Sequence, residues 1–528
     1  MSGSPQEANG LGGRTIYYDL TTSSLANLNV DLITAANLQS EFNAATVTES
    51  AELIAYARGL DVDDLDGDGT TDEPRDWIFG DALHSRPLPL NYGSIGGYSN
   101  PGNPAIYLAV ASNDGLLRMI RNTTGGGAES GQEVWAFMPR RAMPAQSILR
   151  ANGTGMTHPY TVDGAPVAFM LDVNQDGSII SSDGDKVYLY VGMRRGGKAY
   201  YAFDVTNHET PSLMWTIDKG GDFAELGYTF SNPRVGLINT PSGPTPVIMF
   251  AGGYDLNKDS RGAVGTDDSE GNAIYVVNAV NGQLIWKAIR GSGGAGSTVF
   301  EHPRLTDSIP STLSVGDTDG DGFTDRIVVG DTGGNVWRAD IHGTDTSLWK
   351  LTQLASLGRH ATGGIVNDRR FFHRPDLVPS KDSDGMFDAV VIGSGNRPDP
   401  LDKGGLTSNY AFMIKDRHTA PGSGVDENIL VSQLGDVTSN CLQSSSPCSI
   451  DLSKGWALML TEPGEKVLAT ALTITGKTFF TTYLPRSGAG ATACAPSEGA
   501  GRLYAVALQD ATAVINYDTS DDDPSNPD

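Results

Sequence analysis

The chain has 528 residues, with 65 glycines, 28 prolines and a formal net charge of -26, from 37 Lys and Arg against 63 Asp and Glu. Such an acidic chain disfavours binding to nucleic acid or to an anionic membrane. The glycines, together with many aromatic and β-branched residues, indicate short strands and many turns. No apolar run approaches the roughly 20 residues that a membrane-spanning helix needs, so we expect no membrane insertion.

The first 60 residues form a segment of their own. MSGSPQEANG lacks the basic start and the apolar core of a signal peptide. The chain is therefore either cytosolic or a piece of a longer exported protein, and the motifs below favour the second. Apolar residues at helical spacing predict a short helix over 48–61, which Gly59 is placed to end. We interpret residues 1–60 as a remnant of the region that links to an upstream domain.

Two aspartate-rich loops follow, DLDGDGTTD at 64–72 and DTDGDGFTD at 317–325. In a loop that curls on itself, positions 1, 3 and 5 point inward and Gly at position 6 permits the bend. An acid at position 9 closes the loop, and the carbonyl at position 7 is the backbone ligand. Oxygen ligands in this number suit Ca²⁺ better than Mg²⁺. The predicted ligands are Asp64, Asp66, Asp68, Thr70 and Asp72 in the first loop, and Asp317, Asp319, Asp321, Phe323 and Asp325 in the second.

Electrostatics strengthens the case for the second loop. Converging carboxylates repel by roughly 1 kcal/mol per pair even in water. Predicted strands at 313–316 and 326–330 clamp this loop, so its carboxylates cannot spread apart, and a dication would remove the conflict. The alternative is a solvated acidic turn without metal.

Two weaker copies of the loop occur. DVNQDGSII at 172–180 has Ile180 at position 9, where Asp183 or Asp185 could substitute, and its metal binding is left open. SKDSDGMFD at 380–388 begins with Ser380, and we interpret it as a turn without metal.

A hairpin unit recurs along the chain, with a short apolar strand, a Gly-containing turn and a second strand that bears an aromatic residue. Its copies lie at 106–120, 187–204, 247–286, 326–340, 389–416 and 478–509. Several units add a strand with a tryptophan, of the kind that wedges one sheet against the next. Such repeats predict an all-β fold, a modified seven-bladed β-propeller with long insertions. Six visible units and one completed by both chain ends give seven, and six or eight blades stay open.

This interpretation divides the chain as follows. The N-terminal segment ends at residue 60, and a calcium loop and linker occupies 61–76. The propeller spans 77–517, with WIFGDALHSRPLPL at 77–90 as its first strand, and an acidic, disordered tail covers 518–528.

The three cysteines leave two interpretations open. Cys441 and Cys448 flank the polar run CLQSSSPC and could close a local disulfide in an exported protein. Alternatively these two and Cys494 are unrelated thiols.

Enzyme motifs are absent from the sequence. It contains no GxSxG elbow, no HExxH and no P-loop, and its eight histidines are scattered. We therefore predict a protein that is not an enzyme. Two rivals stay open: a periplasmic quinone-dependent dehydrogenase-like propeller and a calcium-dependent lectin-like propeller.

Four segments carry a family resemblance. They are ARGLDVDDLDGDGTTDEPRDWIFGDALHSRPL at 57–88, SVGDTDGDGFTDRIVVGDTGGNVWRAD at 314–340, GEKVLATALTITGKTFFTTYLP at 464–485 and the closing segment at 494–505. Together they resemble the PilC/PilY family of tip-associated proteins of bacterial type IV pili. The resemblance implies a C-terminal seven-bladed propeller in a large exported protein with an upstream von Willebrand factor A-like region.

The resemblance also implies a function. Members act in pilus biogenesis, in opposing pilus retraction, and in adhesion and surface sensing, so twitching motility and virulence are expected to depend on them. The proposed control is calcium in the DxDxDGxxD loop, here at 317–325, and the loop at 64–72 matches a second one of some members. We expect a secreted protein at the pilus tip and outer membrane. Its expected partners are minor pilins, the upstream region of the same protein and a host-cell surface receptor, although no Arg-Gly-Asp integrin motif is present.

Overall fold

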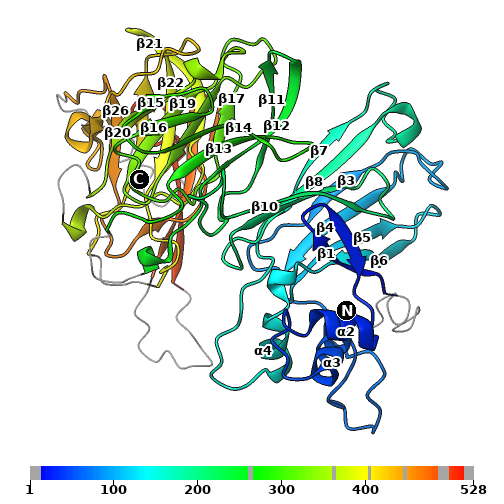
Figure 1. The fold of residues 1–528 in the computed structure, drawn as a ribbon. Coiled ribbons are helices and arrows are strands. Elements are labelled where there is room, and N and C mark those ends of the chain that lie inside the picture. Colours follow the sequence, from blue (N-terminus) through cyan, green and yellow to red (C-terminus); the bar gives the residue numbers. More distant parts are fainter. Residues whose placement is uncertain are drawn as a thin grey trace. The chain divides into compact units, whose positions relative to one another are not determined.

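The computed structural model of the protein describes residues 14–259, 266–359, 364–401, 406–443, 449–485 and 499–515. These residues form two compact units (Figure 1). The first consists mainly of the chain up to Phe223, and the second mainly of the chain from Gly236 onward. No helix among the described residues is long and apolar enough to cross a membrane.

The first unit contains two sheets built from ten strands. The strands are β1 (Ile16–Thr21), β2 (Ser24–Asn27), β3 (Leu88–Asn91), β4 (Ile106–Ser112), β5 (Leu116–Thr123), β6 (Glu129–Phe137), β7 (Val167–Leu171), β8 (Lys186–Gly192), β9 (Ala199–Asp204) and β10 (Ser212–Asp218). Their orders are β2-β1-β6-β5-β4-β3 and β10-β9-β8-β7. Neighbours are antiparallel, except that β1 lies parallel to β6 with Ile16 opposite Ala136.

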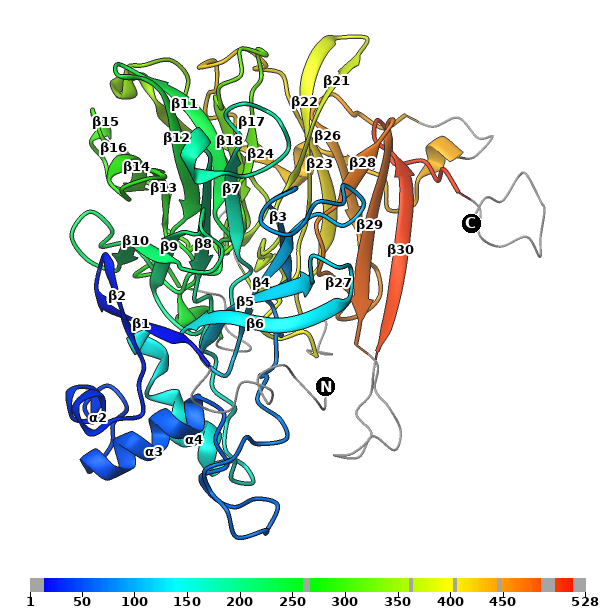
Figure 2. The ribbon, with the colours of Figure 1, turned by 90° about the vertical axis from the view of Figure 1, so that its right-hand side faces the viewer.

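Three α-helices also belong to the first unit and lie together in Figures 1 and 2. They are α2 (Leu32–Leu38), α3 (Val47–Ala57) and α4 (Ala145–Ala151). The Thr46 side chain caps α3 by accepting a hydrogen bond from the Glu49 N–H at 3.1 Å. Gly59 follows this helix with a φ of 101°, a left-handed conformation that favours glycine. The helix predicted over 48–61 is therefore confirmed.

The second unit contains four sheets. Their strands are β11 (Arg234–Thr240), β12 (Gly243–Ala251), β13 (Ala273–Asn278), β14 (Leu284–Arg290), β15 (Gly294–Ala295), β16 (Val299–His302), β17 (Ser314–Gly316), β18 (Arg326–Gly330), β19 (Asn335–Asp340), β20 (Lys350–Ser356), β21 (Asp376–Asp382), β22 (Gly385–Gly393), β23 (Tyr410–Asp416), β24 (Ile429–Leu430), β25 (Gly435–Asp436), β26 (Gly455–Met459), β27 (Lys466–Val467), β28 (Leu472–Ile474), β29 (Lys477–Leu484) and β30 (Ala500–Ala507).

These strands pair mostly with their sequence neighbours. The sheet orders are β11-β12-β13-β14-β16-β15, then β17-β18-β19-β20-β24, then β21-β22-β23-β26-β25, and finally β27-β29-β28, where β30 also pairs with β29. Figure 2 shows β30 beside β29. Short 3-10 helices occur at Arg140–Ala142, Ser181–Asp183, Leu256–Asp259, Thr346–Leu348, Ile365–Asn367, Val431–Gln433 and Cys441–Gln443.

Tryptophans fill the cores between sheets. In the second unit, Trp286 of β14 and Trp349 just before β20 are both fully buried. Their rings meet edge to face, with centroids 6.0 Å apart, so they join two neighbouring sheets. Trp135 of β6 is fully buried in the core of the first unit. The wedging role predicted for these tryptophans is consistent with this packing.

The six predicted hairpins are confirmed, because each pair of predicted strands is present and paired. The described residues form six sheets, and the predicted number of seven blades is not confirmed. The predicted acidic tail, Cys448 and Cys494 lie outside the described residues, and Cys441 is disulfide-bonded.

One strand was predicted wrongly. Only Leu88–Asn91 of the segment 77–90 is a strand, at the edge of its sheet, where Pro89 costs no ladder hydrogen bond on the open side. Trp77 is 78% exposed. The guanidinium of Arg118 lies over the ring of Phe79, with Cζ 4.4 Å from the ring centroid. An apolar run was thus mistaken for a buried strand.

Candidate metal centres

The 317–325 loop joins two paired strands. β17 ends at Gly316 and β18 begins at Arg326, and these two residues are opposite each other in the antiparallel pair. Gly320 and Gly322 have φ values of 81° and 90°, which let the backbone curl. The hairpin therefore holds both ends of the loop, as predicted.

Backbone N–H groups fix the carboxylates of the loop. The two oxygens of Asp317 accept hydrogen bonds from Gly320 at 2.7 Å and from Gly322 at 2.8 Å. Asp321 accepts one from the Phe323 N–H at 2.9 Å. The N–H of Gly322 first, and that of Gly320 after it, lower the pKa of Asp317, so its side chain is held as a carboxylate.

Asp325 closes the loop at its ninth position. Its side chain accepts hydrogen bonds from the N–H and hydroxyl groups of Thr318, at 2.9 and 2.8 Å. Burial raises its pKa, because only 3% of the residue is exposed. A buried carboxylate of this kind favours a positive partner.

The geometry fits a divalent cation. Carboxylate oxygens of Asp317, Asp319 and Asp325 lie within 4.8 Å of one another, and two ligands on opposite sides of Ca²⁺ are about 5 Å apart. Across the described residues, no Lys or Arg forms an ion pair with this trio. Asp321 lies outside the trio, and the ligand roles of Asp321 and the Phe323 carbonyl stay predictions.

The first loop gathers a similar trio. Oxygens of Asp64, Asp66 and Asp68 lie within 4.8 Å of one another. Asp64 has a left-handed φ of 48° and accepts a hydrogen bond from the Gly69 N–H at 3.1 Å. Asp72 lies outside this group, so its ligand role, like that of the Thr70 carbonyl, stays a prediction.

Asp61 is a residue of the first loop that the sequence did not reveal. It is only 4% exposed, and its Oδ2 accepts a hydrogen bond from the Leu65 N–H at 2.8 Å. Its Oδ1 is buried without a hydrogen-bond partner. Leu65 and Thr318 are each the second residue of their loop, so Asp61 takes the place of Asp325. A buried carboxylate oxygen without a hydrogen-bond donor is suited to a cation, although Asp61 lies outside the group formed by Asp64, Asp66 and Asp68.

The 172–180 loop repeats the hydrogen-bond pattern. Asp172 accepts from the N–H groups of Gln175 and Gly177, at 2.7 and 2.8 Å. The buried Asp185 accepts from Val173, the second residue, and from Ile180, both at 2.8 Å. Of the two acids that could close this loop, Asp185 therefore holds the closing position.

In the 380–388 turn, basic side chains pair with the acidic ones. Asp382 pairs with Lys415 and Arg417, each at 2.8 Å, and Asp388 pairs with Arg326. Arg417 first, and Lys415 after it, hold the pKa of Asp382 well below its usual range. Cationic side chains here supply the charge that a metal would supply, in keeping with the interpretation of this turn as metal-free.

Comparisons with known proteins identify the family. Residues 89–348 match the model of the PilY1 β-propeller domain. A PilY1 homolog of Xylella fastidiosa (strain Temecula1), named a type IV pilus biogenesis factor, is 26% identical over 415 residues, which cover 76% of this chain and 26% of the relative. PilY1 of Pseudomonas aeruginosa (strain UCBPP-PA14), also named a type IV pilus biogenesis factor, is 27% identical over 56% of this chain and 23% of its own length. Residues 89–348 of the chain belong to the PilY1 β-propeller domain family.

A solved structure supports the fold of this PilY1-family chain. The crystal structure of the P. aeruginosa PilY1 C-terminal domain matches with a TM-score of 0.52 at 18% identity, covering 77% of this chain and 79% of that one. The predicted β-propeller fold is confirmed by the family model and this structure, and the predicted family by the family model and the two relatives. The matched part spans about a quarter of the length of the curated relatives, 26% and 23% in the two named above.

A groove runs beside the 317–325 loop of this PilY1-family domain. Its volume is about 570 Å³, and Asp317, Thr318 and Asp319 form part of its wall. The remaining wall comes from the start of β17, from 374–379, from Met386 and Asp388, and from 419–421.

Arg326 connects the loop to that groove. It follows Asp325 directly and is fully buried. Its guanidinium donates to the carbonyls of His418, Thr419 and Ala420 and pairs with Asp388. The residue that closes the loop and the residue that positions the opposite wall of the groove are thus adjacent in the chain.

Proposed function

We propose that this chain is the calcium-binding propeller of a type IV pilus biogenesis factor and tip adhesin. Its relatives are named as biogenesis factors, and we extend that role to this chain. The proposed location is the cell envelope and the pilus tip. The proposed partners are minor pilins, an upstream von Willebrand factor A-like region and a host-cell surface receptor.

The observation that carries the proposal is that Asp325 directly precedes Arg326, whose guanidinium binds the carbonyls of 418–420 beside the groove. Bound calcium would neutralise the mutual repulsion of the carboxylates. Asp325 then stays in place beneath Thr318, and Arg326 holds the carbonyls of 418–420. The groove keeps the shape that a protein partner contacts. Without the cation, the trio repels itself, and the wall formed by 317–319 loosens.

The proposed role is non-enzymatic and mechanical. A protein surface that is ordered with calcium and loosened without it would bind a pilus partner in one state and release it in the other. Control of pilus extension against retraction follows from such a switch, and surface attachment and twitching motility depend on the pili that result.

Calorimetric titration tests the first step. Asp325→Ala should show one calcium-binding event fewer than the wild type, because the variant lacks the buried carboxylate. Asp384→Ala is the matched control, since Asp384 lies in the 380–388 turn beside Arg417, where we expect no metal. Unchanged calcium affinity in Asp325→Ala would rule this site out.

A cellular assay tests the second step. A strain that lacks its own copy of the gene receives the full-length gene with Asp325→Ala or Asp384→Ala, and surface pili and twitching zones are measured. We expect defects in both only for Asp325→Ala. Equal piliation and twitching in the two strains would separate calcium binding from pilus control.

A further inference from the structure

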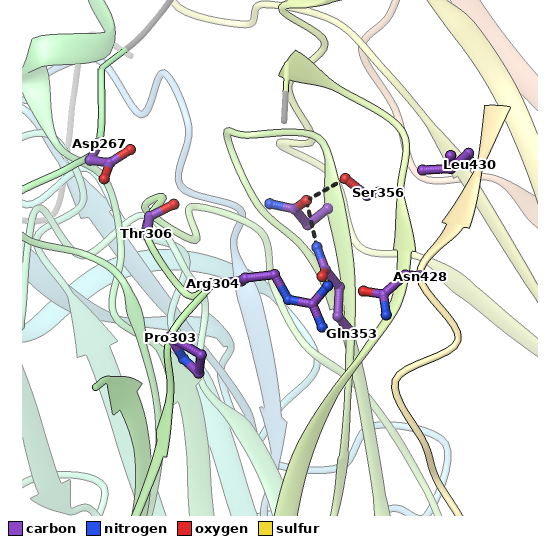
Figure 3. A pocket seen from close by; sticks show the side chains of 9 residues that line it. Asp267, Pro303, Arg304, Thr306, Gln353, Ser356, Asn428 and Leu430 are labelled. Atoms are coloured by element: carbon purple, nitrogen blue, oxygen red, sulfur yellow. Dashed lines mark hydrogen bonds between the residues drawn. The ribbon is translucent and has the colours of Figure 1, made fainter. Parts of the chain in front are cut away.

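A second pocket lies in the second unit, and none of the residues that line it belongs to the two aspartate-rich loops. Figure 3 shows the side chains that line this pocket. Its volume is about 470 Å³, within the range of about 300–1,000 Å³ that is usual for small-molecule sites. Its wall is made by Asp267, Pro303, Arg304, Thr306, Asn335, Gln353, Ser356, Asn428 and Leu430. Amide and hydroxyl side chains therefore dominate it.

A chain of hydrogen bonds fixes the amide of Gln353. The carboxylate of Asp331 accepts from Asn335 Nδ2 at 2.8 Å, which turns Asn335 Oδ1 toward the pocket. That oxygen accepts from Gln353 Nε2 at 2.8 Å and from Ser356 Oγ at 3.1 Å (Figure 3). A flipped Gln353 amide would place two oxygens against each other, so the orientation is determined.

Gln353 Oε1 is left without a partner by this arrangement. The residue is only 2% exposed, and its Oε1 is buried and unpaired. An acceptor left in this state destabilises the fold, because it has lost its water without gaining a donor. Native proteins rarely keep such a group unless a ligand or water satisfies it.

Asn428 supplies a second unmet acceptor on the adjacent segment. It has a left-handed φ of 52°, and its N–H donates to the Gln353 carbonyl at 3.1 Å. Its Nδ2 donates to the Asp426 carbonyl at 3.1 Å, while its Oδ1 is buried and unpaired. Two amide oxygens in one pocket thus lack donors among the residues that the structure describes.

The charges around the pocket are already paired. Asp267 pairs with Arg290 at 3.0 Å and with Arg359 at 3.2 Å. Arg304 pairs with Asp426 at 3.1 Å. Neither a free cation nor a free anion would gain an unpaired partner here. The unmet need is for neutral hydrogen-bond donors.

We propose that this pocket binds a neutral sugar, the terminal ring of a glycan. Sugar hydroxyls would donate to Gln353 Oε1 and Asn428 Oδ1 and could accept from Arg304. Leu430 and Pro303 offer apolar surface to the C–H face of the ring. The site shares no residue with the calcium loops, so its sugar binding is independent of calcium.

Saturation-transfer NMR on the whole chain tests this site. The probes are the methyl glycosides of glucose, galactose, mannose and N-acetylglucosamine at millimolar concentration, with spermidine as a cationic probe. The variants are Gln353→Met and Asn428→Gly. Asn152→Gly is the matched control, because Asn152 also has a left-handed φ, of 38°, and is exposed. Glycine tolerates both backbone conformations, so both variants keep the fold.

We expect at least one glycoside to receive saturation from the wild type and from Asn152→Gly. Each pocket variant should weaken its affinity roughly tenfold or more, because a hydrogen bond to a buried acceptor is lost. EDTA should leave the signal unchanged, so this result stands apart from the calcium proposal. Saturation of no glycoside, of spermidine alone, or to the same degree in all variants would overturn the proposal.

Discussion

Calcium should raise the melting temperature of this chain through the 317–325 loop by an amount that the structure bounds. Three carboxylate pairs lie within 4.8 Å, and each pair repels by about 0.9 kcal/mol at that distance in water and by about 3.5 kcal/mol at an effective dielectric constant of about 20. The trio without a cation is therefore destabilised by at least about 3 kcal/mol.

Calcium at a hundredfold excess over its Kd would add about 2.7 kcal/mol of stability. For a unit of this size that corresponds to roughly 4–5 °C. To isolate this loop, all variants carry Asp64→Asn, which disables the first loop and suits the left-handed φ of 48° there.

Asp325→Asn, in that background, should abolish the calcium-dependent rise. In EDTA it should melt no lower than its parent, because Asn still accepts from Thr318 while two of the three repulsions disappear, about 2 kcal/mol in water. Asp384→Asn should keep the full rise. Differential scanning calorimetry in calcium and in EDTA measures both effects. The reasoning fails if Asp325→Asn keeps the rise, or if it melts far below its parent in EDTA.

Three further predictions follow from other contacts. Asp61→Asn should weaken calcium binding at the first loop about tenfold in calorimetric titration, which corresponds to about 1.4 kcal/mol. The control variant Asp63→Asn should bind calcium as the wild type does. Equal effects of the two variants would show that Asp61 is not part of the site. Asp382→Asn should lower the stability to urea by about 0.5–1 kcal/mol at pH 7 and by less at pH 3. The depressed pKa of Asp382 stabilises the fold at pH values above the pKa of the unfolded state, and this stability is lost as the pH falls. A loss of stability that does not change with pH would contradict this prediction. Trp286→Ala should lower the free energy of unfolding in urea by about 3–5 kcal/mol, and Trp77→Ala, at an exposed position, by less than about 0.5 kcal/mol. A small loss of stability in Trp286→Ala would mean that the two sheets do not depend on the packing of this side chain.

An apolar strand, a Gly-containing turn and a second strand with an aromatic residue were enough to predict the hairpins, because both strands of each pair are close in sequence and most of their side chains are buried. Strand β1, which lies between β2 and β6 in its sheet, was missed. It pairs with β6 more than a hundred residues away, and nothing local to Ile16 indicates that partner. At Trp77 and Phe79 an apolar run lies outside any sheet, since Phe79 is covered by an arginine instead.

The candidate sites show the same limit. The acids at loop positions 1, 3 and 5 are fixed by local turns, so the sequence predicts them directly. The closing carboxylate is set by the fold around the loop. It comes from Asp325 inside one loop, from Asp185 beyond the end of another, and from Asp61 before the start of a third. No fixed spacing could have named all three.

The adjacency of Asp325 and Arg326 constrains how this region can evolve or be engineered. A residue inserted between them would reverse which side chain faces inward, since side chains alternate along β18. The acid would then leave its pocket or the guanidinium would lose the carbonyls of 418–420. If the acidic motif alone were moved into another protein, the proposed calcium binding would therefore be transferred without the proposed effect on the groove.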